Sequence, residues 1–131
     1  MNADRRLAAA VGLDVFSIVL FVAIGRRNHD EEPGLVGVLE TAAPFLIGLA
    51  VAWLLVRAWR RPTSIISGLA VWPVTILVGM IVRSTVFDEG TATSFVIVAT
   101  LFVGACLIGW RTVWRVVERR TRSHSGTLTS I

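Results

Sequence analysis

The sequence predicts an all-α membrane protein with four transmembrane helices packed as an antiparallel bundle. Of its 131 residues, 54% are hydrophobic and only 17% are charged, and the mean hydropathy is +0.71. The apolar residues also come in four runs of roughly 17 to 23, the length that crosses about 30 Å of hydrocarbon at 1.5 Å per residue. A typical soluble domain has neither this composition nor such runs.

The first predicted span covers residues 7–25, and we expect it to be retained rather than cleaved as a signal peptide. Its apolar part exceeds the roughly 7 to 15 residues of a signal-peptide core. Asp14 interrupts it, and Arg26 and Arg27 follow where a small-residue cleavage site would stand.

Three further spans are predicted after the polar turn at Pro33 and Gly34, and they cover residues 36–58, 64–87 and 91–114. A short basic connection broken at Pro62 should make the second and third spans an antiparallel hairpin. Pro73 removes a backbone donor inside the third span and should bend it. Residues 1–122 therefore form one membrane domain, and the Ser/Thr/Gly-rich residues 123–131 are expected to be a disordered tail.

All 13 basic residues are arginines, and their distribution predicts the orientation. Ten lie on the side of the two termini and of the connection between the second and third spans, whereas Arg26, Arg27 and Arg83 lie on the other. By the positive-inside rule both termini are cytoplasmic, as in a multi-pass protein of a bacterial inner membrane. The same distribution accounts for the net charge of +4, so the lipid bilayer and not nucleic acid is the expected partner.

Asp14 lies inside the first span, about 10 Å from its cytoplasmic end. A carboxylate at such a position costs about 2.5 to 3.5 kcal/mol, so it should face the bundle interior and be paired or protonated. Arg57 and Arg111 are the candidate partners, and Arg111 is favoured because it shares a helical stripe with Gly104. A structural ion pair, or a neutral carboxyl bonded to a hydroxyl, is preferred here to a proton or substrate relay.

A second polar group is expected near the outer side. Thr75 lies near the midplane, and Arg83 lies about one turn below the outer surface, level with Arg26, His29 and Glu40. The preferred interpretation is an ion pair between Glu40 and Arg83. The alternative is an outward-facing pocket of Arg26, His29, Glu40 and Arg83 that holds an anionic headgroup or solute, since the guanidinium fork binds oxyanions bidentately.

Other chemistry has little support in the sequence. His29 and the three acids after it lack the spacing of a metal site, and no serine stands in a G-x-S-x-G motif with an intramembrane histidine as base. Cys106 is alone in an apolar run and is expected to be an inert buried thiol. We therefore predict no metal, no cofactor and no catalytic residue. The arginines after the fourth span, with Trp110 and Trp114 at their root, are expected to anchor the chain at the inner leaflet.

At several of these residues the sequence resembles a family of small bacterial and archaeal membrane proteins, catalogued as domain of unknown function 3054. The matching features are Asp14, Gly25-Arg26 with His29, Pro44-Phe45, Trp53, the Trp72 to Thr75 segment, Gly79-Met80 with Arg83, and Gly109-Trp110-Arg111. The resemblance covers about Asp4 to Arg115. It implies a four-helix membrane fold, and it implies no activity, substrate or catalytic residue.

The function expected from the sequence is that of a non-enzymatic integral membrane protein. It would act as a small transporter-like oligomer or as an accessory or lipid-binding subunit of a membrane complex. Four helices enclose little volume, so a transport path would form between protomers, as in a homo-oligomer. The alternative is an intramembrane enzyme that acts on a lipid or isoprenoid headgroup at the outer polar group.

Overall fold

The computed structural model describes the backbone of residues 2–28, 34–86 and 93–129, and their side chains except at residues 27, 28 and 122–129. Within this part the chain forms helices only: α1 (Ala3–Asn28), α2 (Leu35–Val56), the 3-10 turn η1 (Ala58–Arg60), α3 (Ile65–Thr85) and α4 (Thr93–Thr129). Each of the α-helices is long and apolar enough to cross a membrane. The predicted all-α fold of four membrane-spanning helices is confirmed.

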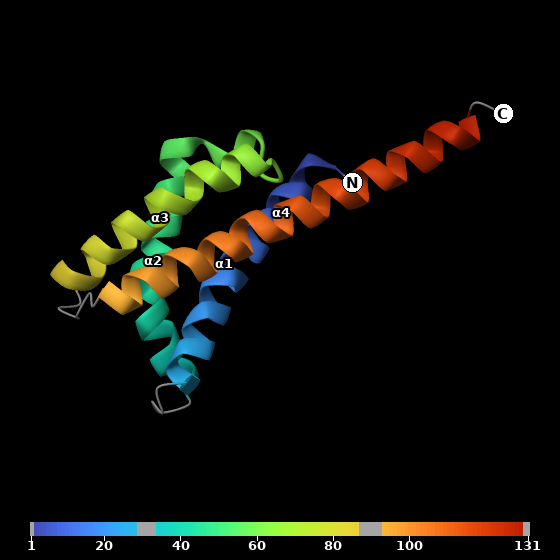
Figure 1. The fold of residues 1–131 in the computed structure, drawn as a ribbon. Helices are drawn as coiled ribbons and strands as arrows, with labels where there is room; N and C mark the ends of the chain where they lie inside the picture. Colours follow the sequence, from blue (N-terminus) through green and yellow to red (C-terminus); the bar gives the residue numbers. More distant parts are fainter. Residues whose placement is uncertain (1, 29–33, 87–92, 130–131) are drawn as a thin grey trace.

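α4 is longer than the fourth predicted span: it continues as a helix to Thr129 and projects beyond the other helices (Figure 1). Of the tail expected to be disordered, residues 130 and 131 lie outside the described residues. No proline follows Pro73 in the chain, and the arginine and glutamate residues after the fourth apolar run favour continuation of a helix that has already formed.

The four α-helices form a ring in which each packs against its neighbours in the chain, and α4 closes the ring against α1 (Figure 1). The closest approach joins α2 to α3 at two glycines. A Cβ on Gly48 would lie 2.6 Å from the carbonyl oxygen of Thr75 and 2.9 Å from the backbone nitrogen of Gly79. Small residues at such a contact let two membrane helices pack backbone against backbone.

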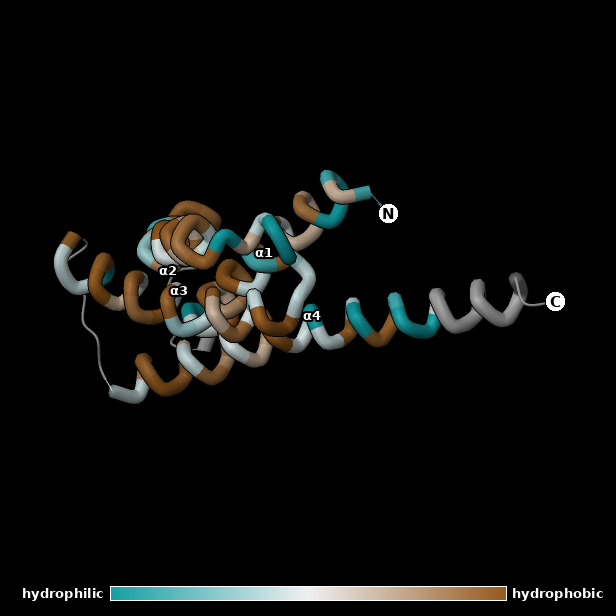
Figure 2. The backbone as a smooth tube through the Cα atoms, turned by 90° about the horizontal axis from the view of Figure 1, so that it is seen from above, coloured by the Kyte–Doolittle hydropathy of each residue, from teal (hydrophilic) through white to brown (hydrophobic). Residues whose placement is uncertain are grey.

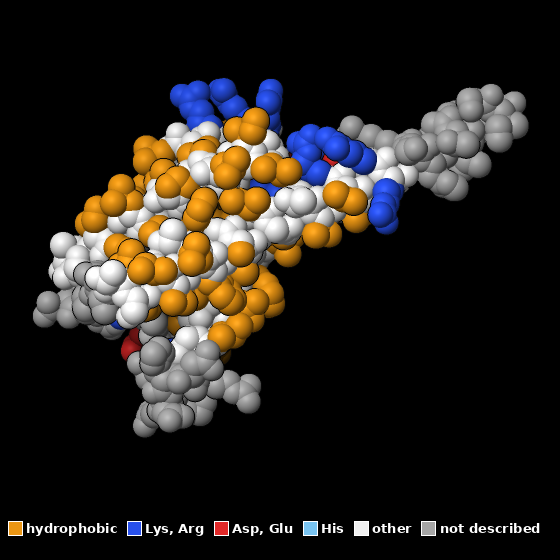
Figure 3. All heavy atoms as spheres, viewed as in Figure 1, with side chains coloured by type: hydrophobic (Ala, Val, Ile, Leu, Met, Phe, Trp, Pro, Cys, Tyr) orange, Lys and Arg blue, Asp and Glu red, His pale blue; other side chains and the backbone are white. Residues whose placement is uncertain are grey.

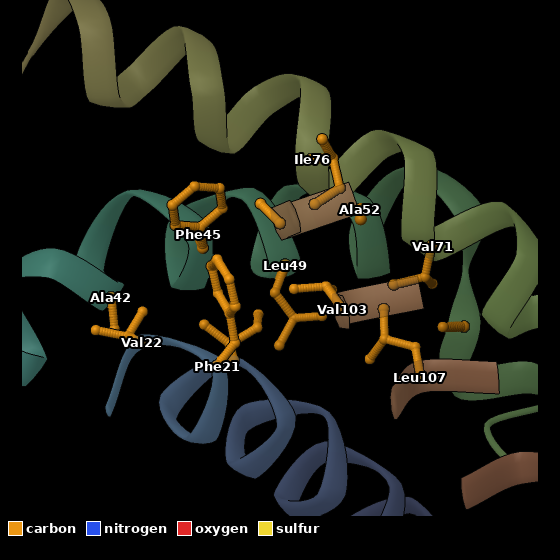
Figure 4. Packing of buried hydrophobic residues seen from close by; sticks show 13 residues of the cluster. Phe21, Val22, Ala42, Phe45, Leu49, Ala52, Val71, Ile76, Val103 and Leu107 are labelled. Atoms are coloured by element: carbon orange, nitrogen blue, oxygen red, sulfur yellow. The ribbon is translucent and has the colours of Figure 1, made fainter. Parts of the chain in front are cut away.

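An apolar core fills the ring (Figure 4). Phe21 of α1 points toward Phe45 of α2, with ring centroids 6.3 Å apart and an edge-to-face arrangement. Phe95 and Phe102 of α4 lie 6.0 and 5.6 Å from the same Phe21 ring. Because lipid is as apolar as this core, its contribution to stability comes from close packing rather than from removal of water.

The two ends of the bundle differ in charge. We call the end that carries the N-terminus, the α2–α3 connection and the α4 extension the arginine-rich end. Hydrophilic residues gather toward this end (Figure 2), and blue arginine side chains crowd it on the face shown in Figure 3. The chain turns there through Arg57, a left-handed residue with φ 58° whose N–H donates to the Trp53 carbonyl. Ser64 then caps α3 by accepting a hydrogen bond from the Ile66 N–H at 3.2 Å.

Candidate functional site

Among the interactions of the described residues, the most connected polar group is the ion pair between Asp14 of α1 and Arg111 of α4. Both side chains are fully buried, with 0% exposure. The guanidinium grips the carboxylate with two parallel bonds, from Nη1 to Oδ1 at 2.9 Å and from Nη2 to Oδ2 at 2.8 Å. The pairing that the sequence favoured is therefore present, and its bidentate form is the strongest geometry available to these two groups.

Two indoles complete the carboxylate's hydrogen bonds. Trp53 Nε1 of α2 donates to Oδ2 at 2.9 Å, and Trp110 Nε1 of α4 donates to Oδ1 at 2.8 Å. Each oxygen of Asp14 thus accepts two hydrogen bonds. Four donated bonds satisfy both oxygens of this buried side chain, which offsets the cost of placing Asp14 in a span. We call Asp14, Trp53, Trp110 and Arg111 the Asp14–Arg111 centre.

Arg111 also ties the centre to the α2–α3 connection. Its Nε donates to the carbonyl of Pro62 at 3.1 Å, and Nη1 donates to the carbonyl of Leu107 at 3.0 Å. Gly68 of α3 admits the side chain, since a Cβ there would lie 2.8 Å from Arg111 Cδ. All four helices therefore meet at this one guanidinium and its carboxylate.

Sequence reasoning missed the role of the two indoles. Trp110 is expected at the root of a surface anchor, because tryptophan is enriched at membrane interfaces, and Trp53 enters only through the family resemblance. Two observations could have indicated their contact with Asp14. Both tryptophans lie at the same depth in their spans as Asp14, and a buried indole N–H needs a hydrogen-bond acceptor.

Thr75, placed near the midplane by the sequence, does not join the centre. Its side chain is fully buried in α3 at the contact with α2. Its hydroxyl has no hydrogen-bond partner among the described residues. Within the part of the chain that the structure describes, no hydrogen bond connects Thr75 with Asp14 or with Arg83.

At the opposite end the expected polar group is only partly assembled. Arg26 Nη1 donates to the Thr41 hydroxyl at 2.9 Å. The Arg83 guanidinium lies over the Phe95 ring, 4.4 Å from its centroid. Glu40 is exposed, and the ion pairs seen among the described side chains join other residues, so the pairing of Glu40 with Arg83 stays a prediction. His29 lies outside the described residues, and the four-residue pocket is therefore not described as a whole.

The arginine-rich end holds a cavity of about 600 Å³ that the sequence did not predict. It lies between the start of α1, the α2–α3 connection and the α4 extension. Five arginines share its lining: Arg6, Arg60, Arg61, Arg115 and Arg119. We call this hollow the arginine cavity. The sequence assigned the arginines of α4 to membrane anchoring, because nothing in it showed that the three segments converge.

Glu118 is the one acid among the described residues that line the arginine cavity. Its Oε1 accepts from Arg6 Nη2 at 3.0 Å and from Trp114 Nε1 at 3.1 Å. This contact joins the start of α1 to the α4 extension. It also leaves the other four arginines of the cavity without an acidic partner in the described part of the chain.

A second hollow, of about 630 Å³, lies between α3 and α4 and is almost wholly apolar. Pro73, Leu77 and Met80 are among its lining residues. Trp72 at its edge donates its indole N–H to the Thr100 carbonyl at 2.8 Å and so has no free donor. Such a surface is suited to lipid acyl chains. No group of three or more metal-binding side chains occurs among the described residues.

Comparison with known proteins places the chain in a family. Neither the curated proteins nor the solved structures contain a match to it. A family model described as "Protein of unknown function (DUF3054)" matches residues 11–114, well over half of the chain. The matched segment includes the whole Asp14–Arg111 centre, whereas Arg6, Arg115 and Arg119 of the arginine cavity lie outside it. The chain is a member of this family of proteins of unknown function, DUF3054, as the resemblance of its residues indicated.

Proposed function

We propose that the protein is a non-enzymatic, multi-pass membrane protein that binds anionic lipid headgroups at its arginine-rich end. The arginine cavity carries this proposal, because five guanidinium groups line it and one carboxylate offsets them. Each basic residue near a membrane surface adds about 1 kcal/mol of attraction for anionic lipid. Guanidinium groups also bind phosphate oxygens bidentately, which holds a headgroup in place as well as attracting it.

The proposed orientation has both termini in the cytoplasm of a bacterial cell. Ten arginines at one end against three at the other support it. Trp59, which also lines the arginine cavity, is 46% exposed and suits the interface between headgroups and acyl chains. The cavity would then lie at the depth of the inner-leaflet headgroups, where anionic lipids are concentrated.

The Asp14–Arg111 centre supports a lipid-binding or accessory role over transport. Both carboxylate oxygens are occupied by two donors each, and the pair is fully buried. A relay residue must exchange its proton or its partner, whereas this carboxylate would have to release four hydrogen bonds to do so. The enzyme alternative has no supporting contact among the described residues of the opposite end.

Native mass spectrometry of the purified protein with lipid tests the proposal. The protein is released from mixed micelles that contain equal amounts of phosphatidylglycerol and phosphatidylcholine with the same acyl chains. We expect preferential retention of phosphatidylglycerol. We expect the variant R60A/R61A to lose the preference, because both side chains line the cavity.

The matched control is R5A/R120A, which removes the same charge from exposed arginines that do not line the cavity. It should keep the preference for phosphatidylglycerol. Equal retention of the two lipids by the unmodified protein would overturn the proposal. An equal loss in both double variants would show diffuse attraction to the basic surface and would also overturn it.

A further inference from the structure

We infer that the arginine cavity is a site for a phosphate group that carries two or more negative charges, a phosphomonoester or a diphosphate. The inference rests on the proposed function and deepens it by naming the chemistry of the ligand. The ligand would be a lipid headgroup or a free phosphate compound, because both present the same terminal oxygens. Its basis is the charge, the donors and the fixed wall of the cavity.

The charge of the cavity exceeds what a single negative charge can offset. Glu118 is already engaged by Arg6 and by the Trp114 indole. The remaining arginines have no acidic partner among the described residues; they are Arg60, Arg61, Arg115 and Arg119. A phosphodiester headgroup carries one negative charge, so most of the mutual repulsion of these guanidinium groups would persist. A phosphomonoester at about pH 8 carries close to two charges, and a diphosphate carries more.

The start of α3 adds donors that suit a terminal phosphate. Thr63 and Ser64 line the cavity, and Ser64 is the N-cap of α3. The Ser64 oxygen accepts the Ile66 N–H, which leaves its own O–H free to donate to a ligand. The helix N-terminus also favours negative charge. A phosphomonoester presents three terminal oxygens to these groups, whereas a diester presents two.

The wall that carries these donors is held in place by the Asp14–Arg111 centre. Arg111 Nε donates to the carbonyl of Pro62, which lies between Arg61 and Thr63. The guanidinium is itself fixed by its two bonds to Asp14. The connection from Arg60 to Ser64 is therefore positioned before a ligand arrives, and a fixed site loses less conformational entropy on binding. In this respect Arg111 is a positioning residue for the cavity.

A titration followed by native mass spectrometry at about pH 8 tests the inference. The detergent-purified protein is titrated with phosphatidic acid, phosphatidylglycerol and phosphatidylcholine of identical acyl chains. We expect phosphatidic acid, a monoester, to bind at least tenfold more tightly than phosphatidylglycerol, a diester. The variant R60Q/R61Q should reduce this ratio to near one, whereas R5Q/R120Q should retain it. A thermal melt of each variant verifies that the exposed substitutions leave the fold intact.

Inorganic pyrophosphate added to the titration separates the two sources of ligand. Displacement of phosphatidic acid by micromolar pyrophosphate supports a free phosphate compound as the ligand. Retention of the lipid under the same conditions supports a lipid headgroup. Equal affinity for phosphatidic acid and phosphatidylglycerol, both above phosphatidylcholine, would overturn the inference and leave the proposed function standing. Binding no tighter than that of phosphatidylcholine would overturn both.

Discussion

At the scale of single residues, the Asp14 carboxylate is stabilised by neighbours from two other helices. Arg111 and Trp110 come from α4 and Trp53 comes from α2, while Asp14 itself lies in α1. Loss of one charge from a buried ion pair leaves the other charge buried and uncompensated. Loss of both charges removes that penalty, although the packing must still be filled.

The variants D14N and R111M are each expected to lower the free energy of unfolding by about 3 to 5 kcal/mol, because each leaves the opposite charge buried without a partner. The double variant D14N/R111M should lose less than the sum of the two, by about 1 to 3 kcal/mol. Unfolding in mixed detergent micelles, followed by circular dichroism, measures all three losses.

The control for this cycle is D4N, which removes an exposed carboxylate from the first turn of the same helix. It should change stability by less than about 0.5 kcal/mol. If the losses in D14N and R111M simply add in the double variant, the two side chains do not stabilise one another and the centre is not an ion pair in the protein.

At the scale of elements, the contact between α2 and α3 depends on glycines without side chains. The atoms that a Gly48 Cβ would meet, the Thr75 oxygen and the Gly79 nitrogen, belong to backbone, so they cannot rotate away. The two helices would have to separate, and the apolar core beside them would lose its close packing.

The substitution G48A is therefore expected to destabilise the bundle by about 1 to 3 kcal/mol, the usual range for overpacking. G12A is the matched control, because a Cβ at Gly12 meets nothing within 4 Å. It should be neutral or stabilising by up to about 1 kcal/mol, since alanine favours helix more than glycine does. Thermal melting in detergent separates the two; equal stability of both variants would contradict the close backbone contact.

Comparison of sequence and structure shows which features depend on one helix and which on several. The length of each apolar run and the depth of Asp14 are properties of single segments, so the spans and the preference for Arg111 could be predicted. Trp53 and Trp110 could not be assigned to Asp14, because their contacts depend on how three helices rotate about their axes. The arginine cavity needs the convergence of α1, the α2–α3 connection and α4, which no local pattern encodes.

At the scale of the whole molecule, the Asp14–Arg111 centre lies across the contact that closes the ring. It joins α1 to α4 and stands nearer the arginine-rich end. Beyond it, toward the other end, the rings of Phe21, Phe45, Phe95 and Phe102 fill the space between the helices. A solute on a path through one protomer would have to displace either a fully bonded ion pair or four packed aromatic rings.

This arrangement predicts that the protein does not conduct protons through its interior. Proteoliposomes with an imposed pH gradient, read by an entrapped pH-sensitive dye, should lose the gradient at the rate of protein-free vesicles, because Asp14 has no open position for an incoming proton. A protonophore added at the end verifies that the gradient was present. D14N should likewise leave the rate unchanged. Protein-dependent decay that D14N abolishes would instead make Asp14 a relay residue and would add proton transport to the proposed lipid binding.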